Sequence, residues 1–284
     1  MDTRLDGWSA LVTGGGSGIG LGCAIRLAVD GAAVTLAGRS EDRLAAGVAA
    51  VEAAVPGAIV RSIPTDVTDE AAVQAAVEAA TAVTGRLDGL VLSAGGSETI
   101  GPVTQIDTEG WRRTLDLNLT GTMLGIKHGA RVMARQGAGS IVAISSIAGA
   151  VTHRWFSAYG PAKAGLDMLV RVAADELGAS GVRVNSVRPG LTRTDLTTFM
   201  TGPGPVLDDY LSCMPLGRIG EPEDVAGLVR FLLGPEASWI TGENISVDGG
   251  HTVRRGPDLS GVLEGLFGAD GLRGLIPSPT PDPA

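Results

Sequence analysis

Short apolar runs alternate with longer stretches of helical spacing along most of the chain. Apolar runs bounded by turn residues predict strands over 8–12, 33–37, 58–63, 89–92, 139–144, 182–187 and 244–247. Apolar residues three and four positions apart predict helices over 19–29, 41–55, 69–83, 109–135, 157–179 and 221–233. Strands that alternate with helices form right-handed βαβ units, whose parallel strands are covered by helices on both faces. The pattern therefore predicts an α/β fold with a doubly wound, seven-stranded parallel sheet of the Rossmann type.

A single large domain is expected over 1–255, because no change of composition marks an earlier boundary. Residues 256–284 are expected to form a C-terminal extension. Prolines alternate through its last residues, which favours an extended and partly disordered end. A weakly amphipathic stretch over 261–276 leaves two alternatives open, a frayed end or a segment docked on a neighbouring subunit or over the active site.

Composition and charge exclude several classes of protein. With 44% hydrophobic and 19% charged residues, the chain lacks the composition of a disordered protein. Its net charge of −9 disfavours partners such as nucleic acids and anionic membranes. The two cysteines, Cys23 and Cys213, show neither a C-x-x-C motif nor metal-ligand spacing, so we expect no disulfide framework and no metal. The N-terminus is charged where a signal peptide would be apolar, and no apolar run is long enough to span a membrane. We therefore expect a cytoplasmic location.

A glycine cluster, T-G-G-G-S-G-I-G over 13–20, separates the first predicted strand from the first predicted helix. Glycine lets the backbone turn sharply and approach a phosphate without a Cβ in the way. The following helix N-terminus offers free N–H groups and a positive dipole to a pyrophosphate. In this strand–turn–helix context, the cluster predicts a dinucleotide-binding loop.

Tyr159 and Lys163 form a Y-x-x-x-K motif at the start of a predicted helix. Residues four apart on a helix share one face, so the phenol and the ammonium should point into the same space. The chain has two tyrosines and two lysines, so one of each meeting at this spacing is unlike a chance pairing. Ser145 and Ser146 end the preceding predicted strand, and alternation along that strand turns one of them toward the same space.

The two motifs together resemble those of the short-chain dehydrogenase/reductase family, of the single-domain kind, over about residues 5–252. The resemblance implies an oxidoreductase that interconverts a secondary alcohol and a ketone, with residues 1–255 as the NAD(P)-binding catalytic domain. It implies that Tyr159 is the acid/base, that Ser146 holds the substrate oxygen, and that Lys163 supports Tyr159. It also implies that Asn118 bends its helix and anchors a water that links Lys163 to solvent.

Lys163 is expected to change the acidity of Tyr159. A free phenol has a pKa of about 10, too high for proton exchange near neutrality. A cation at about 4 Å contributes about 4 kcal/mol at an effective dielectric near 20, which corresponds to about three pKa units. We therefore expect Lys163, aided by an oxidised nicotinamide, to bring the pKa of Tyr159 near 7 against the opposing effect of burial.

The cofactor is expected to be NADP, with NAD as the alternative. Gly38 stands where NAD-preferring members of the family place Asp, and Arg39 follows directly. A guanidinium grips the 2′-phosphate that a carboxylate would repel. The resemblance assigns to the cofactor Gly14, Gly16, Ser17, Gly18, Ile19, Gly20, Arg39, Ser40, Asp66, Val67, Ser93, Ala94, Gly95, Tyr159, Lys163, Pro189, Gly190, Leu191, Thr192 and Thr194.

The substrate is expected to be small and hydrophobic, because the segments that should face it are apolar. The resemblance implies a mobile lid over 195–215, whose glycines allow closure and whose apolar side chains exclude water. The residues expected to contact the substrate are Ser146, His153, Trp155, Tyr159, Leu196, Phe199 and Met200. The resemblance also implies a homotetramer with interfaces built from the two long helices.

Two other functions stay open. A 3-oxoacyl-[acyl-carrier-protein] reductase would dock an acidic carrier, for which Arg131 and Arg135 are suited, but Asp175 and Glu176 on the second long helix oppose it. A non-enzymatic dinucleotide sensor would keep the glycine loop and lose the catalytic groups. Turnover of NADPH or NADP with a panel of ketones and alcohols separates an enzyme from a sensor.

Overall fold

The computed structural model describes residues 4–254 and 268–270, and residues up to Thr252 form one compact unit. The strands are β1 Ser9–Thr13, β2 Ala33–Gly38, β3 Val60–Pro64, β4 Gly89–Leu92, β5 Gly139–Ile144, β6 Val182–Pro189 and β7 Asn244–Val247. They form one parallel sheet in the order β3-β2-β1-β4-β5-β6-β7. The predicted α/β fold with a doubly wound, seven-stranded sheet is therefore confirmed.

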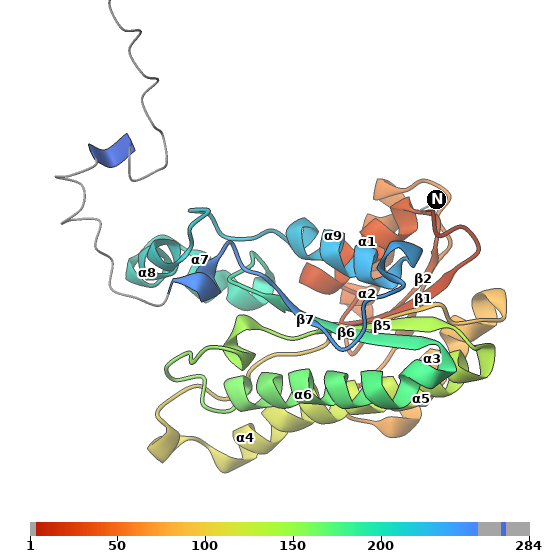
Figure 1. Ribbon diagram of the computed structural model, residues 1–284, viewed down its shortest axis with the longest axis horizontal. Coiled ribbons are helices and arrows are strands. Elements are labelled where there is room, and N and C mark those ends of the chain that lie inside the picture. The colour runs from red at the N-terminus through yellow and green to blue at the C-terminus, as the bar shows by residue number, and fades with distance from the viewer. Residues whose placement is uncertain (1–3, 255–267, 271–284) are drawn as a thin grey trace, which may run out of the picture. The chain divides into compact units, whose positions relative to one another are not determined.

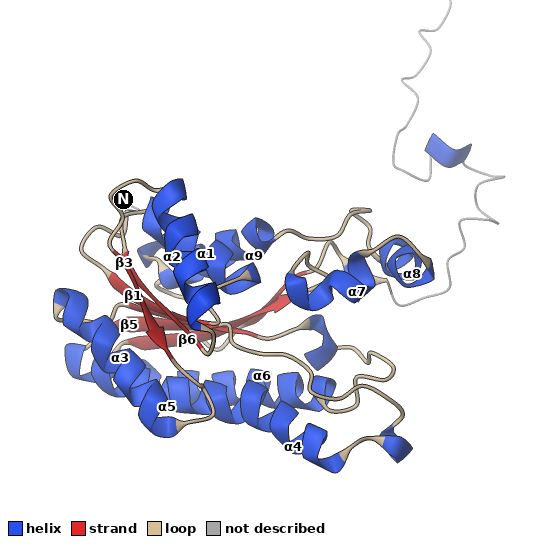
Figure 2. Cartoon of the chain, turned by 180° about the vertical axis from the view of Figure 1, so that it is seen from behind, coloured by secondary structure: helices blue, strands red, loops and turns tan. Residues whose placement is uncertain are grey.

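Helices cover both faces of the sheet (Figure 1). The helices are α1 Gly18–Val29, α2 Glu41–Ala54, α3 Glu70–Thr84, α4 Thr108–Leu115, α5 Gly121–Gln136, α6 Tyr159–Leu177, α7 Thr198–Thr201, α8 Pro205–Cys213 and α9 Pro222–Leu233. Figure 2 shows α1, α2 and α9 on one face, and α3, α5 and α6 on the other. The single-turn 3₁₀ helices are Val103–Gln105, Ile147–Gly149, Gly178–Ser180, Asp195–Thr197, Pro235–Ala237 and His251–Val253.

The central strands β1, β2 and β4 are largely apolar because both of their faces are buried. Along β1, Leu11 packs into the core on the α3, α5 and α6 side, whereas the next residue, Val12, packs into the core under α1, α2 and α9. Successive strand residues point to opposite faces, so both must be apolar when helices cover both. Both side chains are at most 1% exposed.

The helix predicted over 109–135 is interrupted, which corrects the expectation of a continuous helix. A π-helical turn, Asp116–Thr120, separates α4 from α5 and contains Asn118. The Asn118 amide donates to the carbonyl oxygens of Thr114 at 2.8 Å and Gly96 at 2.7 Å, and its oxygen accepts from the Gly96 N–H at 3.2 Å. These bonds tie the wide turn to the segment that follows β4.

The predicted lid segment contains the short helices α7 and α8, which apolar periodicity did not indicate. Neither helix has a fully buried residue, and their apolar side chains pack only in part, against a small cluster of Leu191, Met214 and Ile219. Pro205 is the first residue of α8. Proline fits there because the first N–H groups of a helix have no hydrogen-bond partner within the helix. No helix within residues 4–254 or 268–270 is long and apolar enough to span a membrane. The predicted C-terminal extension, 256–284, lies almost wholly outside the described residues, so its division from 1–255 stays a prediction.

Candidate active site

A cavity of about 680 Å³ opens at the carboxyl ends of the central strands. The predicted cofactor residues on its wall are Gly14, Ser17, Gly18, Ile19, Gly20, Arg39, Val67, Ser93, Ala94, Gly95, Tyr159, Lys163, Pro189, Gly190, Leu191, Thr192 and Thr194. The predicted substrate residues on its wall are Ser146, His153, Tyr159, Leu196, Phe199 and Met200. The residues that the structure does not bring to the wall are Gly16, Ser40, Asp66, Asn118 and Trp155.

The glycine loop passes close to the end of β4. Gly14 has a φ of +65°, and a Cβ there would lie 3.0 Å from the Ala94 backbone nitrogen. A Cβ on Gly20 would lie 2.3 Å from the Gly14 carbonyl oxygen. Ser17 caps α1 without a side-chain bond to the helix, so its hydroxyl and the first N–H groups of α1 remain available to an anion.

Two arginines line the cavity at the end that the cofactor is expected to occupy. Arg39 follows β2, and Arg43, which the sequence motifs did not single out, lies in the first turn of α2. Ser40 caps α2 by accepting a hydrogen bond from the Arg43 N–H at 3.3 Å, which explains why it is not on the wall. Asp66 accepts from the Thr68 N–H at 2.9 Å and its hydroxyl at 2.8 Å. The Thr68 N–H bond, with a contribution from nearby Arg39, lowers the pKa of Asp66.

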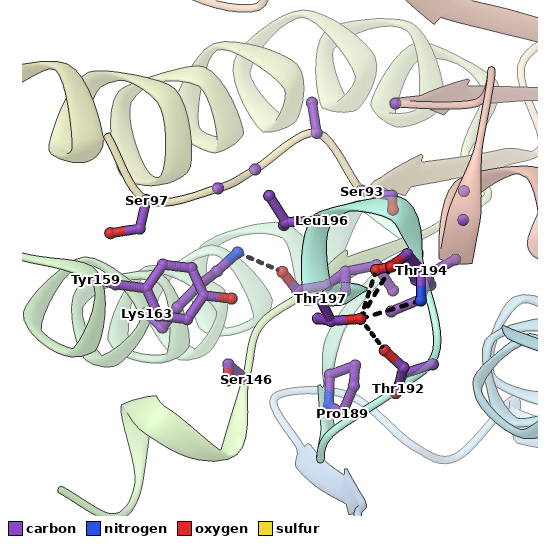
Figure 3. Close-up of a pocket in the computed structure, with 18 of the residues that line it drawn as sticks. Ser93, Ser97, Ser146, Tyr159, Lys163, Pro189, Thr192, Thr194, Leu196 and Thr197 are labelled. Atoms are coloured by element: carbon purple, nitrogen blue, oxygen red, sulfur yellow. Dashed lines mark hydrogen bonds between the residues drawn. The ribbon is translucent and has the colours of Figure 1, made fainter. Parts of the chain in front are cut away.

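Tyr159, Lys163 and Ser146 meet at the middle of the cavity (Figure 3). The Lys163 side chain is 3% exposed, its Nζ donates to the Ile144 carbonyl oxygen at 2.8 Å, and Nζ lies 5.5 Å from the centre of the Tyr159 ring. Ser146 ends the segment after β5 and accepts a hydrogen bond from the Ala148 N–H at 3.1 Å. The Ser145 hydroxyl donates to the Lys163 carbonyl oxygen at 3.4 Å, which leaves Ser146 as the serine beside the phenol.

Burial is the largest influence on the pKa of both groups. Burial raises the pKa of Tyr159 to about 12, although hydrogen bonding with Ser146 lowers it. Burial lowers the pKa of Lys163 to about 8, and the nearby Asp167 carboxylate only partly opposes this effect. Loss of hydration disfavours the phenolate of Tyr159, which raises its pKa, and the ammonium of Lys163, which lowers its pKa. The expected pKa of Tyr159 near 7 includes the charge of an oxidised nicotinamide and stays a prediction for that complex.

Asn118 acts behind the wall rather than on it. A Cβ on Gly95 would lie 2.7 Å from the Asn118 side-chain oxygen and 3.2 Å from the Lys163 Nζ. Gly95 is therefore the point at which the π-turn and the catalytic lysine approach each other. The Asn118 side chain is fully buried, and the hydrogen bonds of its side-chain amide hold the backbone of Gly96 in place.

The loop after β6 is held by threonine side chains. The Thr197 hydroxyl donates to the Thr192 carbonyl oxygen at 2.6 Å and accepts from the Thr194 N–H at 3.0 Å (Figure 3). The Gly190 N–H donates to the Val247 carbonyl oxygen at 2.9 Å. These bonds fix the backbone of a segment that the resemblance assigned to the nicotinamide carboxamide.

The substrate end of the cavity is lined by the rings of His153, Phe156 and Tyr210 and by the Glu98 carboxylate. Asp195 also lies on the cavity wall, and it borders a second, smaller hollow beside Gly18 and Leu21 of α1. Trp155 does not line this end, contrary to expectation. Its φ of 76° turns it outward, where it is 50% exposed and stacks 4.8 Å from the Arg154 guanidinium.

Comparison with known proteins identifies the chain at this point. A family model described as enoyl-(acyl carrier protein) reductase matches residues 14–252. A short-chain type dehydrogenase/reductase from Mycobacterium ulcerans is similar in structure, with a TM-score of 0.87 and 55% identity, over 96% of this chain and 100% of that chain. The chain belongs to the short-chain dehydrogenase/reductase family. It is accordingly an oxidoreductase that acts on a CH–OH group with NAD or NADP.

Two further relatives of this dehydrogenase/reductase have named activities. Cis-4-hydroxycyclohexanecarboxylate dehydrogenase from Sinomonas cyclohexanicum is 42% identical over 244 residues, which are 86% of this chain and 96% of the relative. Levodione reductase is similar in structure, with a TM-score of 0.86 and 33% identity, over 89% of this chain and 100% of that chain.

The wall of the cavity fits the dinucleotide that this dehydrogenase/reductase family uses. Glycine backbone, an open helix N-terminus and two guanidinium groups line one end, which suits pyrophosphate and ribose phosphate. The wall residues with functional chemistry that the motifs missed include Arg43, Glu98 and Tyr210. Arg43 could have been found from its place in the first turn after the second predicted strand, whereas Glu98 and Tyr210 carry no local signal.

Proposed function

We propose that the protein reduces a small ketone to a secondary alcohol, and catalyses the reverse oxidation, with NADP(H) as cofactor and Tyr159 as the acid/base. The observation that carries the proposal is the meeting of Tyr159, Ser146 and Lys163 midway along one cavity. The glycine loop and two arginines line one end of this cavity, and apolar rings line the other. Such a cavity brings a cofactor and a substrate to the same phenol.

In this mechanism, side chains of the protein transfer the proton. A pKa raised to about 12 keeps the Tyr159 phenol protonated near neutral pH, so it is ready to donate to the oxygen of a ketone. Ser146 holds that oxygen by donating a hydrogen bond to it. The Lys163 ammonium stabilises the phenolate that remains after donation. The bound nicotinamide supplies the hydride, and the threonine-held loop after β6 orients its carboxamide.

NADP is proposed over NAD because of the charge at the far end of the cavity. Arg39 and Arg43 both line this end, and each can form charge-assisted hydrogen bonds with a 2′-phosphate. At Gly38, a Cβ would meet nothing closer than 3.6 Å, so the space beside the ribose is open rather than filled by a carboxylate.

The proposed substrate is a small, largely apolar molecule. Leu196, Phe199 and Met200 give the cavity wall apolar surface, which would exclude water when a substrate covers it. The names of the relatives above, with a cyclic hydroxy acid and levodione as substrates, agree with a small substrate of this kind. The 3-oxoacyl carrier-protein alternative is disfavoured by Glu98 at this end, because an acidic carrier would be repelled.

A homotetramer and a cytoplasmic location stay predictions. Exposed apolar side chains on α6, Met168 at 57% and Val172 at 46%, support an interface along this long helix. Light scattering of the full-length protein would test the oligomeric state.

The proposed function is tested by coupled measurements on the full-length protein. We expect NADPH oxidation with a panel of small cyclic ketones, and a lower Kd for NADPH than for NADH by fluorescence titration. Tight NADPH binding without turnover of any ketone or alcohol in the panel would instead identify a sensor.

A further inference from the structure

Two ring side chains from distant segments face each other at the substrate end of the cavity. His153 lies between Ser146 and α6, and Tyr210 lies on α8, with ring centres 6.2 Å apart. His251, near the end of the compact unit, lies 5.8 Å from each of them. We call His153, Tyr210 and His251 the ring cluster. Its first two members line the cavity.

The segment that carries His153 is held in a conformation that turns alternate side chains in opposite directions. The Gly101 N–H donates to the Trp155 carbonyl oxygen at 2.9 Å, and the Ser157 hydroxyl donates to the Gly101 carbonyl oxygen at 3.0 Å. With Trp155 at a φ of 76°, its side chain is exposed while the rings of His153 and Phe156 line the cavity. A residue of this size is strained in the left-handed region, and the surrounding hydrogen bonds must offset that strain.

The ring cluster offers one hydrogen-bond acceptor and one donor. The His153 Nδ1 lies 3.1 Å from the Val151 carbonyl oxygen. Because a carbonyl only accepts, Nδ1 carries the hydrogen, and Nε2 of the uncharged ring is an acceptor. The Tyr210 hydroxyl has only the Met200 sulfur, at 3.9 Å, as its hydrogen-bond partner among the contacts of the described residues, and a thioether is a weak acceptor. Its proton is therefore available to a substrate oxygen.

The charge around the ring cluster disfavours an anionic group. Glu98 lines this end of the cavity, and the Asp209 carboxylate, after burial, contributes to the raised pKa of Tyr210. Among the described residues of the wall, the lysine and arginines are Lys163, behind the reacting phenol, and Arg39 and Arg43, at the cofactor end. A substrate carboxylate would meet acidic neighbours here, whereas a hydroxyl can satisfy the donor and the acceptor together.

We propose that His153 and Tyr210 select substrates that carry an uncharged hydroxyl across the molecule from the reacting carbonyl. Tyr210 donates to the oxygen of this hydroxyl, and the Nε2 of His153 accepts its proton. Phe156 lies between the two sites, with its ring 6.1 Å from Tyr159 and 6.4 Å from His153, and seats the apolar middle of the substrate. The substrate class is a small alicyclic hydroxyketone and, in the reverse direction, its diol. This inference rests on the proposed function.

The test compares three ketones that differ only at the far position: cyclohexanone, 4-hydroxycyclohexanone and 4-oxocyclohexanecarboxylate. We expect the wild-type kcat/KM to be about tenfold higher for the hydroxyketone than for cyclohexanone, the gain of one well-placed hydrogen-bonded pair. The carboxylate should be the poorest of the three. His153→Phe and Tyr210→Phe keep a ring of similar size and should each reduce the hydroxyl preference, the ratio of the first two values, by most of that tenfold.

A matched control comes from the same helix as Tyr210. Val206 on α8 is 52% exposed and does not line the cavity, so Val206→Ala should keep the hydroxyl preference. Fluorescence titration with NADPH shows whether each variant retains a folded cofactor site.

The outcomes separate this inference from the proposed function. Equal kcat/KM for cyclohexanone and the hydroxyketone in the wild type, or an equal loss on both in His153→Phe, overturns the inference and leaves the proposed function standing. A wild-type preference for the carboxylate that His153→Phe removes also overturns it, because the ring would then serve as a cation. No turnover of these or any other ketone overturns both.

Discussion

At the cofactor end of the cavity, the wall is largely backbone that the parallel sheet holds in place, whereas at the substrate end it is side chains on short, peripheral elements. The glycine loop lies against the end of β4, where a Cβ on Gly14 would contact Ala94. The substrate end draws on α7 and α8, which have no buried residues of their own. A wall of backbone presents the same groups whatever the surrounding sequence, so it suits a shared cofactor. A wall of side chains changes with single substitutions and suits substrate selection.

Between the two ends, the Lys163 side chain is buried and Tyr159 is half-buried on the cavity wall. Tyr159→Phe removes the hydroxyl that lies between the cofactor end and the substrate end. It should lower kcat by about 10²–10⁴, the usual contribution of a general acid. Steady-state rates with NADPH and a turned-over ketone measure this loss. NADPH titration of the variant should give a Kd close to that of the wild type. Retention of full turnover by a folded variant would remove Tyr159 from the mechanism.

Although the wall of the cofactor end is largely backbone, its expected preference for NADP depends on two side chains, and this dependence can be tested. Arg39→Ala and Arg43→Ala should each weaken NADPH binding about 10- to 100-fold, because each loses a charge-assisted hydrogen bond. NADH binding should change much less. Arg61→Ala, an exposed arginine of β3 outside the cavity wall, is the matched control for the loss of positive charge. An equal loss for both cofactors would argue against a 2′-phosphate site.

Burial of the Lys163 ammonium should destabilise the folded protein. Its pKa falls from 10.5 to about 8 on burial, so the unfolded chain binds one more proton between these values. The free energy of unfolding should therefore rise as the pH rises from about 8 to 10.5, by on the order of 3 kcal/mol. Lys163→Met should remove this rise and be more stable at neutral pH, while losing activity. Urea unfolding at several pH values measures both effects, and an identical pH dependence in the variant would contradict the expected burial cost.

The rigidity of the cofactor end should appear in stability as well as in binding. Gly20→Ala places a Cβ 2.3 Å from the Gly14 carbonyl oxygen, so it should destabilise the fold by about 1–3 kcal/mol. Gly227→Ala on α9 meets nothing within 4 Å and should stabilise the helix by up to about 1 kcal/mol. Thermal unfolding of the two variants measures the difference. Similar melting temperatures would show that the loop relaxes around the new methyl group.

The strands were the most predictable part of the fold. The predicted bounds 89–92, 139–144 and 244–247 coincide with those of β4, β5 and β7. The two short lid helices were not predicted, because each has few residues and packs its apolar side chains against a small cluster that distant segments form. The break in the long helix also escaped the periodicity, because hydrogen bonds between Asn118 and a distant loop stabilise the π-turn.

The candidate site was predictable where its residues are neighbours in sequence. The glycine loop, the Y-x-x-x-K pair and the serine before it were all expected on the cavity wall, where they lie. Trp155 was expected beside the substrate, but a local backbone turn points it to solvent. Tyr210 escaped notice, because it reaches His153 only when α8 folds back over the cavity.

By itself, the sequence determined the order of strands and helices, the dinucleotide loop and the chemistry of the reacting phenol, because hydrophobic period and short motifs express these locally. Only the tertiary structure decided how acidic that phenol is and which side chains surround the substrate. The cost of removing charge from water depends on burial, and the approach of His153, Tyr210 and His251 joins segments that are far apart along the chain. Neither quantity exists before the chain has folded.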